Sequence, residues 1–212
     1  MINKFTILVL ILSFCSCKKE KQGLINLKQN LVEETVNTEP KELDYAKEIE
    51  HIKSFAKKGD YNQKFAIMIN YGLHSGKNRL FVVDLKKDSI IKKALVCHGS
   101  GKGKNTKAIP TVFSNVSESH CSSLGMAVMG KRAYSRWGKN YKYWIDGLEE
   151  TNSNMRKRIV VLHGWKEMPE KETYPKPIAT SWGCPTVTID FLDQLDAILK
   201  KNEKVLFYSF KE

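Results

Sequence analysis

From residue 65 onward, the chain is built from short apolar and β-branched runs separated by polar turns, a pattern typical of strands. The runs lie at residues 65–69, 80–85, 90–97, 124–129, 141–148, 158–162 and 205–210. The first three follow one another closely and predict an antiparallel meander. The pattern predicts a mainly β domain with flanking helices, an α+β class, and shows no internal repeat.

Helical spacing appears in two stretches. The first covers residues 42–58 and ends at Gly59, with the apolar positions Leu43, Ala46, Ile49, Ile52 and Phe55. The second follows Cys184 and has an apolar stripe formed by Ile189, Leu192, Leu195 and Leu199. Thr188 is its expected N-cap. Cys184 is therefore expected just before a helix N-terminus, whose partial positive charge favours a thiolate.

The N-terminal segment has the pattern of an export signal. Residues 1–17 have a basic start, an apolar core too short to span a membrane, and a Cys15-Ser16-Cys17 ending. This resembles a bacterial lipoprotein signal, with Cys17 as the acylated residue; cleavage as an ordinary signal peptide is the alternative. Residues 18–41 are polar and predict a flexible tether. The catalytic domain is predicted at residues 42–212.

The formal net charge of +12 is spread along the chain. A nucleic-acid interface needs basic residues interleaved with aromatic ones on one element, whereas the excess charge here is not concentrated in one arm, and the export signal also argues against such an interface. Two readings of the charge remain: contact with an anionic polymer outside the cytoplasm, or lysines that serve solubility.

The strongest candidate for chemistry is a histidine followed by a cysteine. His163-Gly164 ends an apolar run, and a polar loop leads to Ser181-Trp182-Gly183-Cys184-Pro185. A neighbouring imidazole is the usual base that converts a thiol to a thiolate. Gly183 allows a sharp bend that brings backbone N–H groups close to a reacting carbonyl. Cys184 is the predicted nucleophile, His163 its base, and Ser181 a support of the turn.

These residues resemble the catalytic signature of the L,D-transpeptidase (YkuD-type) family. The branch described as murein L,D-transpeptidase catalytic domain also has an HGSG segment, an FSN element and an SSLG element. They are matched here by residues 98–101, 113–115 and 122–125. The commoner family pattern has a second histidine at the place of Trp182 and a basic residue at the place of Pro185. The resemblance implies a YkuD-like β-sandwich or barrel.

The resemblance also implies a reaction. Cys184 would attack an L,D-peptide bond in a peptidoglycan stem peptide, and an amine or water would resolve the thioester. An amine makes the protein a transpeptidase, and water makes it an L,D-carboxypeptidase. Another cysteine hydrolase and a non-catalytic wall-binding lipoprotein are the further alternatives. No metal or organic cofactor is needed. We expect a monomeric, membrane-anchored extracytoplasmic lipoprotein, periplasm-facing where two membranes are present.

Other polar residues have two readings each. His98 either contacts substrate or bonds to loop carbonyls, and Asn115 and Ser122 either bind substrate or cap loops. Cys97 and Cys121 are either a disulfide or two buried thiols. Zinc-ligand spacing is absent, since no C-x-x-C or H-x-x-x-H occurs.

Overall fold

The computed structural model describes residues 44–212, so the predicted signal peptide, the acylation site Cys17 and the tether lie outside the described residues. Two α-helices are present in this part, α2 (Ala46–Lys58) and α3 (Ile189–Leu199), with one short 3-10 turn, η1 (Gly101–Gly103). The strands are β1 (Phe65–Asn70), β2 (Leu80–Asp84), β3 (Ser89–Ala94), β4 (Gly125–Tyr134), β5 (Tyr141–Gly147), β6 (Val161–Gly164), β7 (Thr186–Val187) and β8 (Leu206–Phe210).

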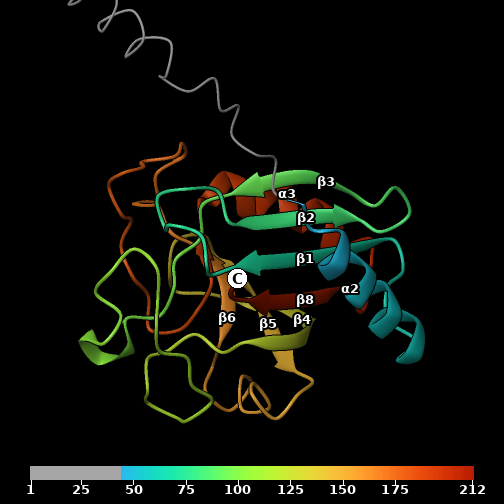
Figure 1. Cartoon of the computed structure of the whole chain (residues 1–212), viewed down its shortest axis with the longest axis horizontal. Coiled ribbons are helices and arrows are strands. Elements are labelled where there is room, and N and C mark those ends of the chain that lie inside the picture. Colours follow the sequence, from blue (N-terminus) through green and yellow to red (C-terminus); the bar gives the residue numbers. More distant parts are fainter. Residues whose placement is uncertain (1–43) are drawn as a thin grey trace, which may run out of the picture. The chain divides into compact units, whose positions relative to one another are not determined.

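All eight strands form one sheet in the order β3-β2-β1-β8-β4-β5-β6-β7. The first three strands pair antiparallel, as the expected meander requires. β8 pairs parallel with β1 and antiparallel with β4, so it lies between them in the sheet (Figure 1). The predicted fold class, mainly β with flanking helices, is confirmed.

The two helices cover opposite faces of the sheet because β1 is apolar on both faces. Its alternate residues Ile67 and Ile69 pack in the cluster that contains the buried side of α3. Ala66 and Met68 point the other way and pack with α2 residues such as Ile52. A strand buried on both faces reads as a continuous apolar run, which is the pattern of residues 65–69.

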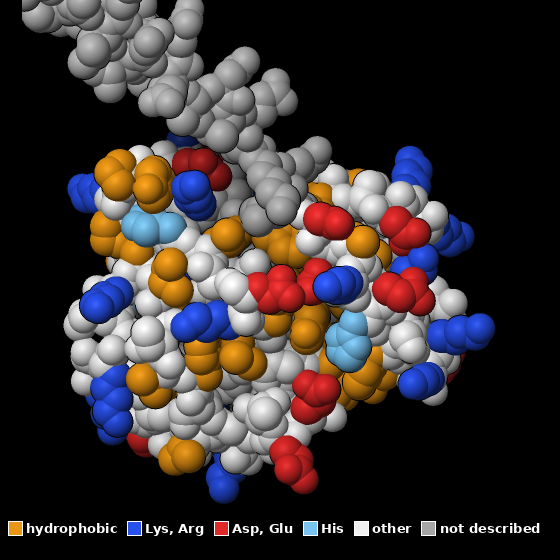
Figure 2. All heavy atoms as spheres, viewed as in Figure 1, with side chains coloured by type: hydrophobic (Ala, Val, Ile, Leu, Met, Phe, Trp, Pro, Cys, Tyr) orange, Lys and Arg blue, Asp and Glu red, His pale blue; other side chains and the backbone are white. Residues whose placement is uncertain are grey.

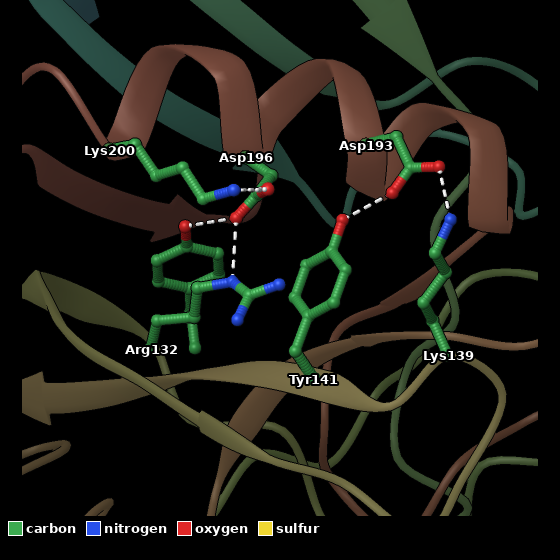
Figure 3. Close-up of polar contacts among 7 residues, drawn as sticks. Arg132, Lys139, Tyr141, Asp193, Asp196 and Lys200 are labelled. Atoms are coloured by element: carbon green, nitrogen blue, oxygen red, sulfur yellow. Dashed lines mark hydrogen bonds and ion pairs between the residues drawn. The ribbon is translucent and has the colours of Figure 1, made fainter.

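A polar network ties α3 to β4, β5 and the turn between them, and it is formed by Arg132, Lys139, Tyr141, Tyr143, Asp193, Asp196 and Lys200 (Figure 3). Asp196 accepts hydrogen bonds from Arg132 Nε at 2.9 Å and from the Tyr143 hydroxyl at 2.6 Å. Lys200 Nζ lies 2.7 Å from the same carboxylate. Asp193 accepts from Lys139 Nζ at 2.6 Å and from the Tyr141 hydroxyl. The helix is therefore fixed by polar contacts as well as by its apolar side.

Charged side chains are dispersed on one face of the described structure. On the face shown in Figure 2, Lys and Arg side chains are scattered and Asp and Glu lie among them. A single basic stripe, the footprint of a nucleic-acid interface, does not appear on that face. Within residues 44–212, no helix has the length and apolar character needed to cross a membrane.

Two sequence predictions placed elements wrongly near the candidate site. The run 158–162 was expected to be a strand that ends before His163, but β6 begins at Val161 and includes His163. Residues 151–159 form turns, and Ile159 has a φ of +58°. The strand β7 was missed because two residues are too short to produce a periodic pattern.

Candidate functional site

Strand pairing brings the predicted base and nucleophile segments together. β6 and β7 pair in parallel, with His163 opposite Thr186 and Gly164 opposite Val187. Cys184 lies two residues before Thr186, and the carbonyl of Pro185 accepts a hydrogen bond from the N–H of His163 at 3.4 Å. His163 and Thr186 are 23 residues apart in sequence, yet they lie on adjacent strands of the sheet.

The hydrogen bonds of the His163 ring define its tautomer. Nδ1 lies 3.2 Å from the carbonyl oxygen of Gly164, which only accepts, so Nδ1 carries the proton and donates. Nε2 is then an acceptor in the neutral ring and lies 3.1 Å from the Thr186 hydroxyl. Burial, aided by the nearby Lys142, lowers the pKa of His163. The imidazole is therefore neutral at neutral pH and oriented to take up a proton at Nε2.

The Cys184 thiol is half-buried, and the turn before β6 contacts it. Its Sγ is 3.6 Å from the carbonyl oxygen of Ile159. Burial raises the pKa of the Cys184 thiol, against the N–H of Val161 and the positive charges of Lys142 and Arg158, which act to lower it. Burial has the larger effect, so the resting thiol is protonated at neutral pH.

The resting site is thus a neutral thiol beside a neutral imidazole. Within residues 44–212, no hydrogen bond joins Sγ to the His163 ring, because Nε2 is occupied by Thr186. Such contacts are often loose without substrate and tighten in the reacting complex. The arrangement can transfer a proton from thiol to imidazole when a substrate enters; it does not hold a preformed ion pair.

The expected contribution of the helix dipole stays a prediction. Thr188 caps α3 as predicted, accepting a hydrogen bond from the N–H of Phe191 at 3.1 Å. However, β7 lies between Cys184 and the first turn of the helix. The side-chain cations that act on the thiol are Lys142 and Arg158, whose positive charges act to lower the pKa of Cys184.

The turn before the nucleophile is held by Ser181. Its hydroxyl accepts from the N–H of Gly183 at 3.1 Å and donates to the carbonyl of Cys184 at 2.7 Å. Gly183 has a φ of +109°, and a Cβ there would lie 2.7 Å from the carbonyl oxygen of Cys121. Its N–H is occupied by Ser181, whereas the N–H of Cys184 donates to no atom within residues 44–212. The free N–H is the available donor to an oxyanion.

The HGSG segment is the backbone partner of this turn. Gly99 and Ser181 form an isolated parallel bridge, with Ser181 N donating to the His98 carbonyl and Ser100 N donating to the Ser181 carbonyl, both at 2.8 Å. The N–H of Cys97 donates to the Thr186 carbonyl at 3.1 Å. Residues 181–186 are therefore held between β6 on one side and residues 97–100 on the other.

His98 is buried, with 1% of its surface exposed. Its Nδ1 lies 2.8 Å from Nη2 of Arg79, and because arginine only donates, Nδ1 accepts and Nε2 carries the proton. Burial, together with repulsion from Arg79, lowers the pKa of His98 to about 4. Nε2 has no hydrogen-bond partner in the described chain. In this structure, His98 therefore supports the turn from inside and is closed to solvent.

Arg79 is the buried cation behind the HGSG segment. It is fully buried and donates to the carbonyls of Val96, Leu73 and Ala108. Burial lowers its pKa to about 10, so it stays charged at neutral pH. It fixes loops on both sides of the site.

Asn115 and Ser122 lie in contacts between loops. The side chain of Asn115 donates to the carbonyl of Glu150 at 2.7 Å and accepts from the N–H of Asn154 at 3.0 Å. The Ser122 hydroxyl is buried and accepts from the N–H of Gly99 at 3.0 Å. These contacts correspond to the loop-capping reading of both residues.

Cys97, Cys121 and Cys184 are all free thiols. Cys97 Sγ lies 3.2 Å from the sulfur of Met168, and burial raises its pKa to about 12, so this thiol is inert. Of the two readings for Cys97 and Cys121, the structure has two buried thiols. No group of three or more His, Cys, Asp or Glu side chains suited to a metal occurs within residues 44–212.

Exposed aromatic side chains flank the site. Trp182 is 77% exposed and stacks on His120, with centroids 4.7 Å apart and an interplanar angle of 6°. On the other side, the ring of Trp137 lies 6.0 Å from that of His163. An exposed indole therefore lies near each catalytic candidate: Trp182 two residues before Cys184, and Trp137 near the ring of His163.

The comparison that decides the family is a match over residues 36–208 to the family described as YkuD_2, L,D-transpeptidase catalytic domain. The chain belongs to this family. The family predicted from the motifs is confirmed, and with it the class of enzyme. No curated protein sequence matches the chain.

Several solved structures have a partial likeness to this YkuD_2 domain. Bd1075 of Bdellovibrio bacteriovorus is 13% identical with a TM-score of 0.44, over 71% of this chain and 49% of that one. The Ldtfm–avibactam carbamoyl enzyme is 11% identical with a TM-score of 0.43, over 71% and 50%. An L,D-transpeptidase from Xylanimonas cellulosilytica is 12% identical with a TM-score of 0.40, over 74% and 68%. The chain spans about half the length of the first two.

Sequence reasoning missed four residues around the YkuD_2 site: Arg79, Lys142, Arg158 and Thr186. Thr186 was the easiest to find, because a hydroxyl two residues after a candidate nucleophile faces the same side of an extended segment. The other three reach the site only through strand pairing and loop packing, so their spacing in the sequence gives no signal.

Proposed function

We propose that the chain is a cysteine L,D-transpeptidase that acts on peptidoglycan stem peptides through a thioester at Cys184. One observation carries the proposal: the parallel pairing of β6 with β7 sets the imidazole of His163 beside the segment of Cys184, with Nδ1 bound to the Gly164 carbonyl and Nε2 left as acceptor. Family membership supports the choice of substrate.

The first half-reaction forms a thioester at Cys184 and releases D-Ala. The thiol of Cys184 gives its proton to Nε2 of His163, and the sulfur attacks the carbonyl carbon of the third stem residue, a diamino acid. The N–H of Cys184 donates to the oxyanion that forms. The C–N bond then breaks, the imidazolium returns the proton to the nitrogen, and D-Ala leaves as the free amine.

In the second half-reaction, the amine of another stem attacks the thioester carbon. His163 accepts the proton of this amine, the C–S bond breaks, and the thiolate of Cys184 recovers a proton. The product is a cross-linked stem, and no oxidant, metal or cofactor takes part. Water in place of the amine would give a shortened stem, the outcome expected of an L,D-carboxypeptidase.

The test is mass spectrometry of the peptide that contains Cys184 after the full-length protein meets purified tetrapeptide stems. We expect an acyl adduct on Cys184, no adduct in Cys184→Ala, and acylation slowed by about 10²- to 10⁴-fold in His163→Gln. Lys58→Gln, a change at an exposed position at the end of α2, serves as a control. Absence of an adduct in the wild type would refute the proposal.

The acceptor is identified in the same experiment by adding an amine-bearing stem. Cross-linked product supports transpeptidation, and tripeptide alone supports hydrolysis. Wall binding that survives in Cys184→Ala, without any adduct in the wild type, supports the non-catalytic alternative.

We further propose that acylation at Cys17 anchors the enzyme outside the cytoplasm, which would place the site near the wall. The support is the signal pattern of residues 1–17. Membrane fractionation of wild type against Cys17→Ser tests it. We expect the variant to leave the membrane fraction, and equal retention of both proteins would contradict the anchor.

A further inference from the structure

The guanidinium of Arg158 lies beneath the nucleophile turn and is bound only by neutral groups. Nη1 donates to the carbonyl of Ser114 at 2.8 Å and to the hydroxyl of Ser123 at 2.6 Å. Nη2 donates to the carbonyl of Cys121 at 2.6 Å and to the hydroxyl of Ser119 at 3.3 Å. No ion pair within residues 44–212 includes Arg158, and no carboxylate neutralises its charge locally.

Arg158 is close to the nucleophile by two independent routes. A Cβ at Gly183 would lie 3.4 Å from its Nη2, which places the guanidinium under the residue that precedes Cys184. Along the chain, the next residue is Ile159, whose carbonyl contacts Sγ at 3.6 Å. The charge and the contact to the thiol thus come from neighbouring residues of one turn.

The backbone of this turn is strained. Ile159 has a φ of +58°, which is rare for a β-branched residue, and its side chain is 55% exposed. Packing of the side chain does not explain why this conformation is kept. The conformation directs the carbonyl of Ile159 toward Sγ while Arg158 reaches beneath the turn. Strain of this kind clusters at functional sites.

Other charged or titratable groups also face the thiol. Lys142 of β5 is positive and lies near both His163 and Cys184. The phenol of Tyr71 and the imidazole of His163 are neutral at neutral pH. Cys121 lies near Arg158. Arg158 and Lys142 are therefore the two cations that act on Cys184, and only Arg158 is also bound to the loop beneath the turn.

We propose that Arg158 is a positioning residue with two effects: it clamps the loop 114–123 beneath the nucleophile turn, and its unneutralised charge stabilises the Cys184 thiolate. The proposal rests on the proposed function, since it assigns the group that opposes the burial of the nucleophile.

The test is the rate of iodoacetamide alkylation at Cys184 against pH, followed on the Cys184 peptide by mass spectrometry in the full-length protein. We expect Arg158→Gln to shift the profile to higher pH and to slow alkylation at pH 8 by about three- to tenfold, since the lost thiolate is partly offset by greater nucleophilicity. Arg158→Lys keeps the charge and should retain most of the wild-type rate.

Lys157→Gln is the matched control, because it removes one exposed positive charge at the adjacent position and should leave the profile unchanged. An unchanged profile in folded Arg158→Gln would overturn the proposal. If Arg158→Gln does not fold, Arg158→Lys tests the proposal instead. A wild-type alkylation profile with faster hydrogen exchange in residues 114–123 supports both the clamp on the loop and the effect of charge on the thiolate. A profile shifted by as much as a full pH unit refutes the role of charge.

This readout needs no stem peptide, so the two proposals fail separately. A shifted alkylation profile without any acyl adduct would leave the role of Arg158 intact and reject the proposed substrate. An acyl adduct together with an unchanged alkylation profile in Arg158→Gln would support the proposed substrate and reject the role of Arg158.

Discussion

Gly183 and Ile159 meet at the nucleophile, and both have φ values in the left-handed region. The glycine adopts its angle without steric cost, whereas the isoleucine is strained. At Gly183 the carbonyl of Cys121 also occupies the space that a side chain needs. Two separate constraints, conformation and contact, thus fix glycine at this position.

We predict that Gly183→Ala lowers the rate of Cys184 acylation by more than about 100-fold, because the collision with Cys121 displaces the turn by several tenths of an ångström. Stability should fall by only about 1–3 kcal/mol, the usual cost of local backbone strain. Acylation is measured by mass spectrometry, and stability by urea unfolding.

Gly103→Ala is the control for conformation alone. Gly103 also has a positive φ, +87°, but a Cβ there would meet nothing within 4 Å. The Gly103→Ala variant should have a lower free energy of unfolding but an unchanged rate of Cys184 acylation. Equal acylation rates in Gly183→Ala and the wild type would show that the contact with Cys121 is unimportant.

At the scale of elements, α3 depends on the carboxylate of Asp196. Burial acts to raise its pKa, but hydrogen bonds from Lys200, Tyr143 and Arg132 outweigh burial and hold the pKa below the usual value of 3.8. The folded protein therefore binds this proton less tightly than the unfolded chain. Its stabilisation is complete above about pH 4 and is lost as the pH falls through the lowered pKa.

We predict that Asp196→Asn lowers the free energy of unfolding at pH 7 by roughly 1–3 kcal/mol, because the groups that donate to the carboxylate lose their charged acceptor. The loss should shrink as the pH falls below about 4, since the wild type then loses the same interaction. Urea unfolding at several pH values measures both. Glu170→Gln, an exposed carboxylate outside the network, should show neither effect, and a loss that is constant with pH would contradict the prediction.

Much of the element inventory could be read from the sequence. The periodic stripes located α2 and α3, and Thr188 was recognised as a cap because its position relative to the stripe is local information. The meander β1-β2-β3 followed from short turns between apolar runs. These elements depend on residues close together in the sequence, so local patterns were sufficient to locate them.

The site could be predicted only as far as its motif. Cys184 and His163 stand out by residue type, but the cations Arg158 and Lys142 reach the thiol across the pairing of β5 with β6 and through a turn with an unusual φ. His98 looked like a possible substrate contact because its partner Arg79, 19 residues away, is not apparent from spacing. Pairing between distant segments is what a single sequence does not display.

At the scale of the molecule, β8 joins the two parts of the sheet. It follows every other strand in the chain, yet β1 and β4 contact it on either side. Its residues Leu206 and Phe207 are buried on opposite faces, so each core cluster includes one of them. The strand therefore belongs to both cores at once.

We predict that a variant ending at Lys204, which lacks β8, fails to fold, because β1 and β4 lose their shared partner and both clusters lose buried side chains. A variant ending at Phe210 keeps the strand and should unfold cooperatively. Circular dichroism during heating distinguishes them, and a cooperative transition in the shorter variant would contradict the prediction.

The place of β8 also bears on how the polypeptide is made. A ribosome releases residues 206–210 after all the other strands, and the sheet has a gap at its middle until they arrive. The nascent chain cannot close into its native form early. The order of synthesis therefore leaves the two parts of the sheet, β3-β2-β1 and β4-β5-β6-β7, unjoined until the last strand is made.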